Sequence, residues 1–224
     1  MVEEEKGNLL PSYSVPERYF YLMVLRCPKC EKGPFDLVST EQPPEQNRDI
    51  WFVRCRECRQ GQRLVFDRDT LLADESTSAS ATVPEVNPTT QVSRLIDVGQ
   101  WLSLFYHILS VASEEKDRKK AQHLGYEATL CLEEALKFYA PDSDLPPSEA
   151  LWVETSKQNL KERPELFLRQ KLLQMREKLP NLQVMRKAIS TDFEAPSANG
   201  HHDQKKHWWS KWFNRLTQRR IFLW

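Results

Sequence analysis

The sequence predicts an α+β protein in which a small antiparallel β module comes first, an antiparallel α-helical bundle follows, and an amphipathic helix closes the chain. Three observations predict this order. Two short aromatic and aliphatic segments each lead into a pair of cysteines, apolar residues recur at helical spacing beyond residue 88, and the chain ends in an aromatic, basic stretch. The predicted divisions are an N-terminal segment (1–18), the β module (19–72), a linker (73–87), the helical bundle (88–189), a second linker (190–204) and the C-terminal helix (205–224).

The β module is predicted to contain three or more short antiparallel strands, with a cysteine turn at each of two hairpins. Residues 19–26 have the composition of a strand that runs into the first cysteine pair. Residues 49–54 repeat that arrangement before the second pair, and residues 62–66 follow it. Residues 41–48 are polar and are expected to form a loop within the module.

Four cysteines in two Cys-x-x-Cys pairs, Cys27 with Cys30 and Cys55 with Cys58, have the spacing of a closed tetrahedral zinc site. Each pair presents two thiolates from one backbone turn. Four protein ligands leave no coordination position for water, so such an ion stabilises the fold and does not activate a nucleophile. We therefore expect structural Zn²⁺, while a redox dithiol, a rubredoxin-type iron site and a pair of disulfides are alternatives for the same residues.

Over residues 19–68 the sequence resembles the zinc-ribbon superfamily with rubredoxin-type knuckles, and Cys-Pro-Lys-Cys is the most specific part of the match. The resemblance implies that the four cysteines are the metal ligands. Each turn continues toward a glycine, Gly33 or Gly61, which is expected to let backbone amides approach the sulfurs. These glycines come three residues after the cysteine instead of one or two, a departure from the family pattern that predicts a looser knuckle.

The helical bundle is predicted from four amphipathic segments joined by short connections. Asn87 and Pro88 are expected to cap and open the first, whose apolar residues recur from Val92 to Ala112. Cys131 lies on the apolar stripe of the second, where a buried core thiol is expected. The other three segments span about 115–139, 148–163 and 164–180.

The chain carries 32 lysines and arginines and 32 aspartates and glutamates, so it has no overall field that attracts polyanions. It opens with acidic residues where a secretory signal would be basic, and no segment has the roughly 20 apolar residues of a membrane-spanning helix. Thiolates that hold zinc also fit a reducing compartment. We expect a cytoplasmic protein, with the C-terminal helix as the element that would place it peripherally at a membrane.

The C-terminal helix is predicted to be amphipathic, with six lysines and arginines against one acid between His201 and Trp224. Three partners for its aromatic face are open: the bundle or a second copy of the chain, an anionic membrane surface, and nucleic-acid bases. The residues predicted to make the membrane or partner contact are Trp208, Trp209, Lys211, Trp212, Phe213, Arg215, Leu216 and Arg219.

The function predicted from these features is that of a zinc-binding adaptor or regulatory protein that acts by binding another protein. A second hypothesis is a nucleic-acid accessory role, in which Arg54, Arg56, Arg59 and Arg63 contact phosphates together with the basic tail. The third is an enzyme with an unrecognised site in the bundle. The chain has no glycine-rich phosphate loop, nucleophile elbow or HExxH motif, so no catalytic residue and no small-molecule substrate is predicted.

Overall fold

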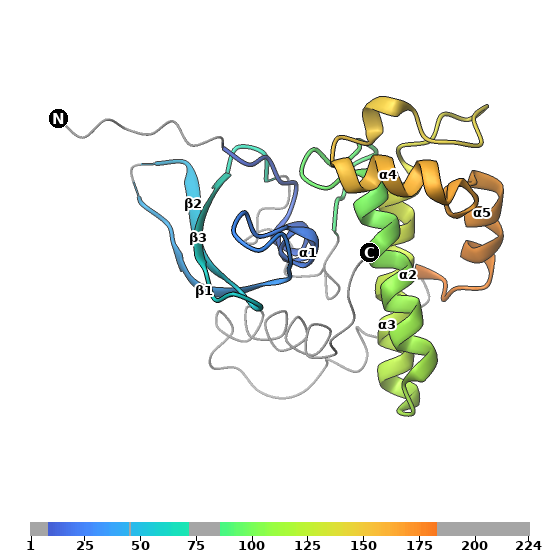
Figure 1. Cartoon of the computed structure of the whole chain (residues 1–224), viewed down its shortest axis with the longest axis horizontal. Helices are drawn as coiled ribbons and strands as arrows, with labels where there is room; N and C mark the ends of the chain where they lie inside the picture. The colour runs from blue at the N-terminus through green and yellow to red at the C-terminus, as the bar shows by residue number, and fades with distance from the viewer. Residues whose placement is uncertain (1–8, 45, 72–85, 183–224) are drawn as a thin grey trace.

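The computed structural model describes residues 9–44, 46–71 and 86–182. This part of the chain contains a three-stranded antiparallel sheet and five α-helices, which confirms the α+β class. Figure 1 shows the sheet at one end, the long helices at the other, and one short helix between them. The predicted C-terminal helix, the second linker and most of the first linker lie outside the described residues.

The sheet consists of β1 (Phe35–Glu41), β2 (Arg48–Cys55) and β3 (Gly61–Asp67), paired in the order β1-β2-β3. Both neighbouring pairs are antiparallel. The strands predicted at 49–54 and 62–66 are therefore confirmed, and the polar segment after β1 connects it to β2.

Residues 19–26 do not form the predicted strand, because most of them belong to a helix, α1 (Val15–Val24). The hydroxyl of Ser14 caps this helix by accepting a hydrogen bond from the N–H of Glu17, 3.1 Å away, and Pro16 occupies its first turn. A short apolar segment can form either a strand or a helix, and the residues that begin a helix decide between the two. The strand prediction was wrong because these residues, Ser14 and Pro16, precede the segment on which it was based.

Helix α1 lies between the sheet and the long helices (Figure 1), and its aromatic side chains contact both. Tyr19 packs on Trp51 of β2 with ring centroids 5.1 Å apart. Phe20 meets Trp101 of α2 (Val98–Glu114) edge to face at 5.6 Å. The buried apolar side chains of the sheet and the helices therefore form one continuous cluster.

The two longest helices, α2 and α3 (Arg118–Leu136), pack along each other and confirm the two long helices predicted from periodicity. Asn87 does not cap the first of them. Its side-chain oxygen accepts hydrogen bonds from the N–H and the hydroxyl of Thr89. The N-cap of α2 is Asp97, which forms a reciprocal capping box with Gln100. The predicted cap was wrong because an Asx turn uses the same side-chain oxygen.

The two helices that follow α3 are shorter than predicted. They are α4 (Glu154–Glu162) and α5 (Arg169–Glu177), and each comes after a separate 3-10 turn, Ser148–Ala150 and Pro164–Leu166. Pro164 opens the second turn, and the extended backbone of Leu168 separates that turn from α5. Helix α4 packs on α2, and α5 packs on α3.

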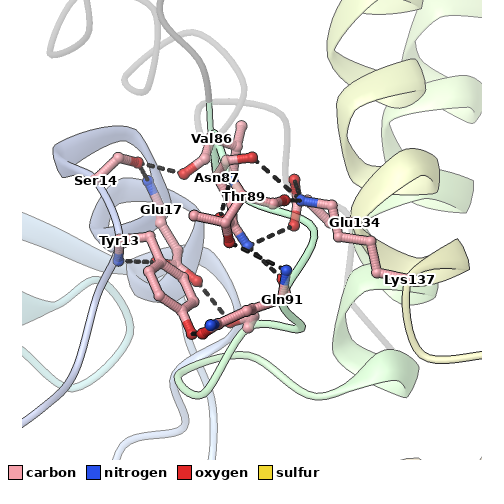
Figure 2. Close-up of polar contacts among 10 residues, drawn as sticks. Tyr13, Ser14, Glu17, Val86, Asn87, Thr89, Gln91, Glu134 and Lys137 are labelled. Carbon is pink, nitrogen blue, oxygen red and sulfur yellow. Dashed lines mark hydrogen bonds and ion pairs between the residues drawn. The ribbon is translucent and has the colours of Figure 1, made fainter. Parts of the chain in front are cut away.

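A polar cluster, most of whose side chains are buried, joins α1 to α3 through residues 86–93 (Figure 2). On one side Glu17 accepts a hydrogen bond from the hydroxyl of Ser93 at 2.6 Å. On the other, the ammonium of Lys137 donates to Glu134 at 2.8 Å and to two backbone carbonyls of the segment. We call this cluster the polar joint, and it comprises Tyr13, Ser14, Glu17, Asn87, Thr89, Gln91, Ser93, Glu134 and Lys137.

The polar joint should make stability fall as the pH rises toward neutrality. Burial raises the pKa of Glu134 from 4.5 to about 7, even though Lys137 beside it acts in the opposite direction. Burial also raises the pKa of Glu17. A raised folded-state pKa means that the folded chain holds a proton which the unfolded chain has released. This contribution to stability is therefore complete below the pKa that the group has in the unfolded chain, and it is lost as the pH rises through the pKa that the group has in the folded chain.

The variant Glu134→Gln tests this pH dependence, because it keeps an acceptor for Lys137 and removes the titration. Between about pH 5.5 and about pH 8, the free energy of unfolding of the wild type should fall by about 2 kcal/mol relative to that of the variant. Urea unfolding at both pH values measures the difference. Parallel pH dependence in the two proteins would contradict the expectation.

Candidate metal centre

The four predicted cysteine ligands lie in two turns at one end of the sheet. The first turn follows α1 and precedes β1, and the second connects β2 to β3. The sulfur atoms of Cys27, Cys30, Cys55 and Cys58 all lie within 4.8 Å of one another. Two sulfur pairs cross between the turns, Cys27 with Cys58 at 3.5 Å and Cys30 with Cys55 at 3.7 Å. The structure thus brings the whole predicted ligand set together.

Both turns have the same backbone conformation. The carbonyl oxygen of the first cysteine accepts a hydrogen bond from the N–H four residues later: Cys27 from Glu31 at 2.8 Å, and Cys55 from Arg59 at 3.0 Å. Glu31 and Arg59 adopt left-handed conformations with φ of 58° and 62°, which is uncommon for residues other than glycine. The same unfavourable backbone conformation occurs at the same position of both turns. This repetition indicates that the conformation is kept for a function, which here is to position the cysteine side chains.

The glycines that follow the turns do not supply this left-handed conformation, which lies two residues before each of them. A Cβ on Gly33 would lie 2.7 Å from the carbonyl oxygen of Leu25, so this glycine allows two backbone segments to pass closely. A Cβ on Gly61 would meet only the carbonyl oxygen of Val53, at 4.0 Å. Neither Cβ contact involves a sulfur, so the expectation that the glycines let amides approach the sulfurs stays a prediction.

Backbone amides donate to the sulfurs in the same pattern in both turns. The Sγ of Cys27 accepts from the N–H groups of Lys29 and Cys30, and the Sγ of Cys55 accepts from the matching amides of the second turn. Burial opposes ionisation of Cys27, but the amides together with hydrogen bonds from the neighbouring thiols lower its pKa to about 7, whereas burial prevails at Cys55 and raises its pKa. Amides directed at sulfur favour the thiolate, which is the form that binds a metal.

The sulfur positions fit a tetrahedral metal ion. Metal–sulfur bonds of about 2.3 Å, the value for zinc, produce a tetrahedron with sulfur–sulfur edges of about 3.8 Å. The two separations between the turns, 3.5 and 3.7 Å, lie close to that edge length. A disulfide would require about 2.05 Å, and all five cysteines are free thiols. The donor set and its spacing are therefore those of a closed four-thiolate site.

Of the four arginines predicted to contact nucleic acid, Arg56 is engaged within the protein. Its guanidinium pairs with Asp36 of β1 at 2.6 Å and so links the second turn to the start of β1. Sequence spacing does not identify this pair, because the two residues come together only when β1 and β2 align. Arg54, Arg59 and Arg63 are exposed, and none of them forms an ion pair within the described part of the chain.

The fifth cysteine, Cys131, is fully buried in α3, which confirms the predicted core thiol. Burial raises its pKa well above the ordinary value, and the carboxylates of Glu127 and Glu134 add to the shift. A thiol that resists ionisation is a poor nucleophile and a poor metal ligand. Cys131 therefore belongs to the packing of the helices.

The tail residues predicted to contact a membrane or partner, from Trp208 to Arg219, lie outside the described residues, so that contact stays a prediction. In residues 9–44, 46–71 and 86–182, no helix is both long enough and apolar enough to span a bilayer. No protein-family model, curated protein or solved structure matches the chain. Its function is therefore inferred from its own residues.

Proposed function

We propose that the chain is a zinc-binding adaptor or regulatory protein that acts by binding another protein. One observation carries the metal assignment: four cysteine sulfurs from two equivalent turns lie within 4.8 Å of one another. Soft thiolate ligands at tetrahedral spacing suit Zn²⁺, whose filled d shell imposes no competing geometry. In this proposal the sheet with its two cysteine turns is a zinc ribbon, and helices α2 to α5 are the bundle attached to it.

The role of the zinc ion in this proposal is structural. Four protein thiolates complete a tetrahedral shell, so the bound water that zinc activates in hydrolytic enzymes has no position. The ion would instead fix the chain between α1 and β1 against the β2–β3 hairpin. The exposed surfaces of the sheet and the helices are then the parts that act, through contact with a partner.

Binding to a protein is supported by large apolar side chains held at the surface. Val38 of β1 is 54% exposed, and Trp152, which precedes α4, is 44% exposed. The ring of Trp152 lies against that of Phe138, with centroids 6.2 Å apart, so its position is fixed on one side by packing. Aromatic side chains that are already held in place lose little entropy on binding and are frequent hot spots of protein interfaces.

Metal analysis of the purified, reduced chain tests the zinc assignment. We expect about one zinc ion per chain, and we expect Co²⁺ to replace it with the visible absorption of a tetrahedral thiolate complex. The variant Cys131→Ala is a control that should retain the full metal content. Iron in place of zinc, or no bound transition metal in reduced protein, would contradict the assignment.

We place the attachment element of this adaptor in the tail, because its aromatic and basic residues suit an anionic surface. The full-length chain should sediment with vesicles that contain phosphatidylserine, and a chain without residues 205–224 should not. Phosphatidylcholine vesicles are the matched control. If deletion leaves sedimentation unchanged, or lowers the melting temperature of the helices by several degrees, the tail serves packing and not attachment.

A further inference from the structure

The face of the sheet that points away from α1 contains a shallow hollow beside the second cysteine turn. Side chains alternate along a strand, so Phe52 and Arg54 of β2 lie on the face opposite to Trp51 and Val53, which are buried. The strand register places Arg63 of β3 beside Phe52. The hollow has a volume of about 280 Å³. Its lining comprises Val38, Phe52, Arg54, Gly61 and Arg63, together with Val53 and Gln62, which alternate with them along the same strands.

Two cations border this hollow. Arg54 and Arg63 are exposed, and neither forms an ion pair with a described residue. The acid that faces Arg54 across the strands is Asp36, and Arg56 already holds its carboxylate at 2.6 Å. The lining residue Val38 adds an exposed apolar side chain and Phe52 a half-buried one. The hollow thus combines an apolar surface with two arginines that form no ion pair with a described acid.

We propose that this hollow binds an extended acidic peptide segment of a partner protein. In this arrangement one apolar side chain of the segment packs on Phe52 and Val38, and carboxylates on either side pair with Arg54 and Arg63. Arginine suits this task because its planar guanidinium can donate two parallel hydrogen bonds to one carboxylate. The inference rests on the protein-binding part of the proposed function and identifies the chemistry of the partner.

The size and charge of the hollow favour a peptide over other anions. Ligand pockets for small molecules span about 300–1,000 Å³ and enclose most of the ligand surface, whereas this hollow lies at the lower end of that range and is open on one side. Binding of single-stranded nucleic acid needs a track of cations along several phosphates and aromatic rings for successive bases. The hollow has one half-buried aromatic ring and two arginines instead of such a track. The residues at the far end of the same sheet include two acids, Glu41 and Asp67, which do not extend it.

The glycine in the lining provides a way to close the hollow without disturbing the fold. Gly61 lies opposite Arg54 in the strand pair, and a Cβ there would meet only the carbonyl oxygen of Val53, at 4.0 Å. A β-branched residue therefore fits the strand and occupies space that the peptide would use. Gly61→Thr should leave the metal content and the melting temperature unchanged and still abolish peptide binding.

Fluorescence anisotropy with a labelled peptide, Glu-Asp-Asp-Phe-Asp-Glu, tests the proposal on the full-length, zinc-loaded chain. We expect saturable binding with a Kd of about 10–500 µM, a range usual for short peptides on shallow sites. Arg54→Gln with Arg63→Gln should weaken binding about tenfold or more. The matched control, Arg118→Gln with Lys119→Gln, removes the same charge from the exposed start of α3 and should change binding less than about twofold.

Three results would overturn the proposal. The first is the absence of binding by zinc-loaded wild-type chain at about 1 mM peptide. The second is peptide binding that neither the double arginine variant nor Gly61→Thr changes. The third is a twelve-nucleotide oligothymidine that binds more tightly than the peptide and displaces it, which would make the face a nucleic-acid surface. Metal content is measured on every sample, so loss of zinc, which would contradict the proposed function, is distinguished from loss of peptide binding.

Discussion

Replacing Cys55 with serine should abolish the proposed zinc site and unfold the sheet. Cys55 is completely buried at the end of β2, and its sulfur lies 3.7 Å from that of Cys30 in the other turn. Structural zinc contributes on the order of 10 kcal/mol to the folding of small metal-binding modules. Because whole domains are stable by only about 5–15 kcal/mol, the loss of one ligand should leave the sheet largely unfolded at room temperature.

The consequences of this substitution should reach the helices as well. The buried side chains of the sheet, α1 and α2 belong to one cluster, so an unfolded sheet removes apolar contacts from the helical part. Circular dichroism should show a lower melting temperature for the helical signal, and zinc analysis should show less than about a tenth of the wild-type content. A strong chelator added to reduced wild-type protein should reproduce both changes.

The matched control for Cys55→Ser is Cys131→Ala. Cys131 is equally buried, but it lies in α3 away from the sulfur cluster, so its replacement should cost only the transfer and cavity terms of one small side chain, about 1–2 kcal/mol. Zinc content should stay at the wild-type value. If Cys55→Ser and Cys131→Ala proved equally stable and equally loaded with zinc, the four-thiolate site would not hold the fold together.

The parts of the molecule that were predicted from sequence are those set by local patterns. The two Cys-x-x-Cys pairs identified the sulfur cluster, because each pair fixes two ligands within one turn. Strands β2 and β3 were identified by their composition, and α2 and α3 by an apolar period long enough to exclude a strand. In each of these cases a few neighbouring residues carry the information.

The features that escaped prediction depend on contacts between distant segments or on competing local signals. Helix α1 was missed because its residues suit both a strand and a helix, and Ser14, which caps it, precedes them. The hydrogen bond from Ser93 to Glu17 joins residues 76 positions apart. Buried charges such as Arg18 also carry no periodic pattern, since each depends on one partner elsewhere in the chain.

The second large expected effect is a loss of stability when the carboxylate of Asp49, the partner of the buried Arg18, is removed. Arg18 of α1 is completely buried and pairs with Asp49 of β2, with 2.5 Å between Nη1 and Oδ2. Its Nε donates to the hydroxyl of Ser12 at 2.8 Å, and its guanidinium carbon lies 4.5 Å from the ring centroid of Phe66. The pair thus fixes α1 on the sheet within the apolar cluster.

Asp49→Ala should lower the free energy of unfolding by about 3–5 kcal/mol, because it leaves the Arg18 cation buried without its carboxylate. Arg18→Met should cost less, since Arg68, whose Nε lies 3.7 Å from Oδ1 of Asp49, remains as a counter-ion for that carboxylate. The double variant Arg18→Met with Asp49→Leu should recover most of the loss, because an apolar pair needs no desolvation of charge. Urea unfolding of the zinc-loaded proteins measures all three.

The control for these variants is Glu133→Ala, which breaks an ion pair of similar length at the surface. The Oε1 atom of Glu133 lies 2.5 Å from the Nε atom of Arg176, but the two side chains are 26% and 49% exposed. Solvent screens such a pair, so its loss should cost less than about 1 kcal/mol. Burial, and not the distance between the charged atoms, therefore sets the expected difference between the two pairs. If Asp49→Ala lowered the free energy of unfolding no more than Glu133→Ala does, solvent would stabilise the charge of Arg18 in the variant. Helix α1 would then be held to the sheet by apolar packing alone.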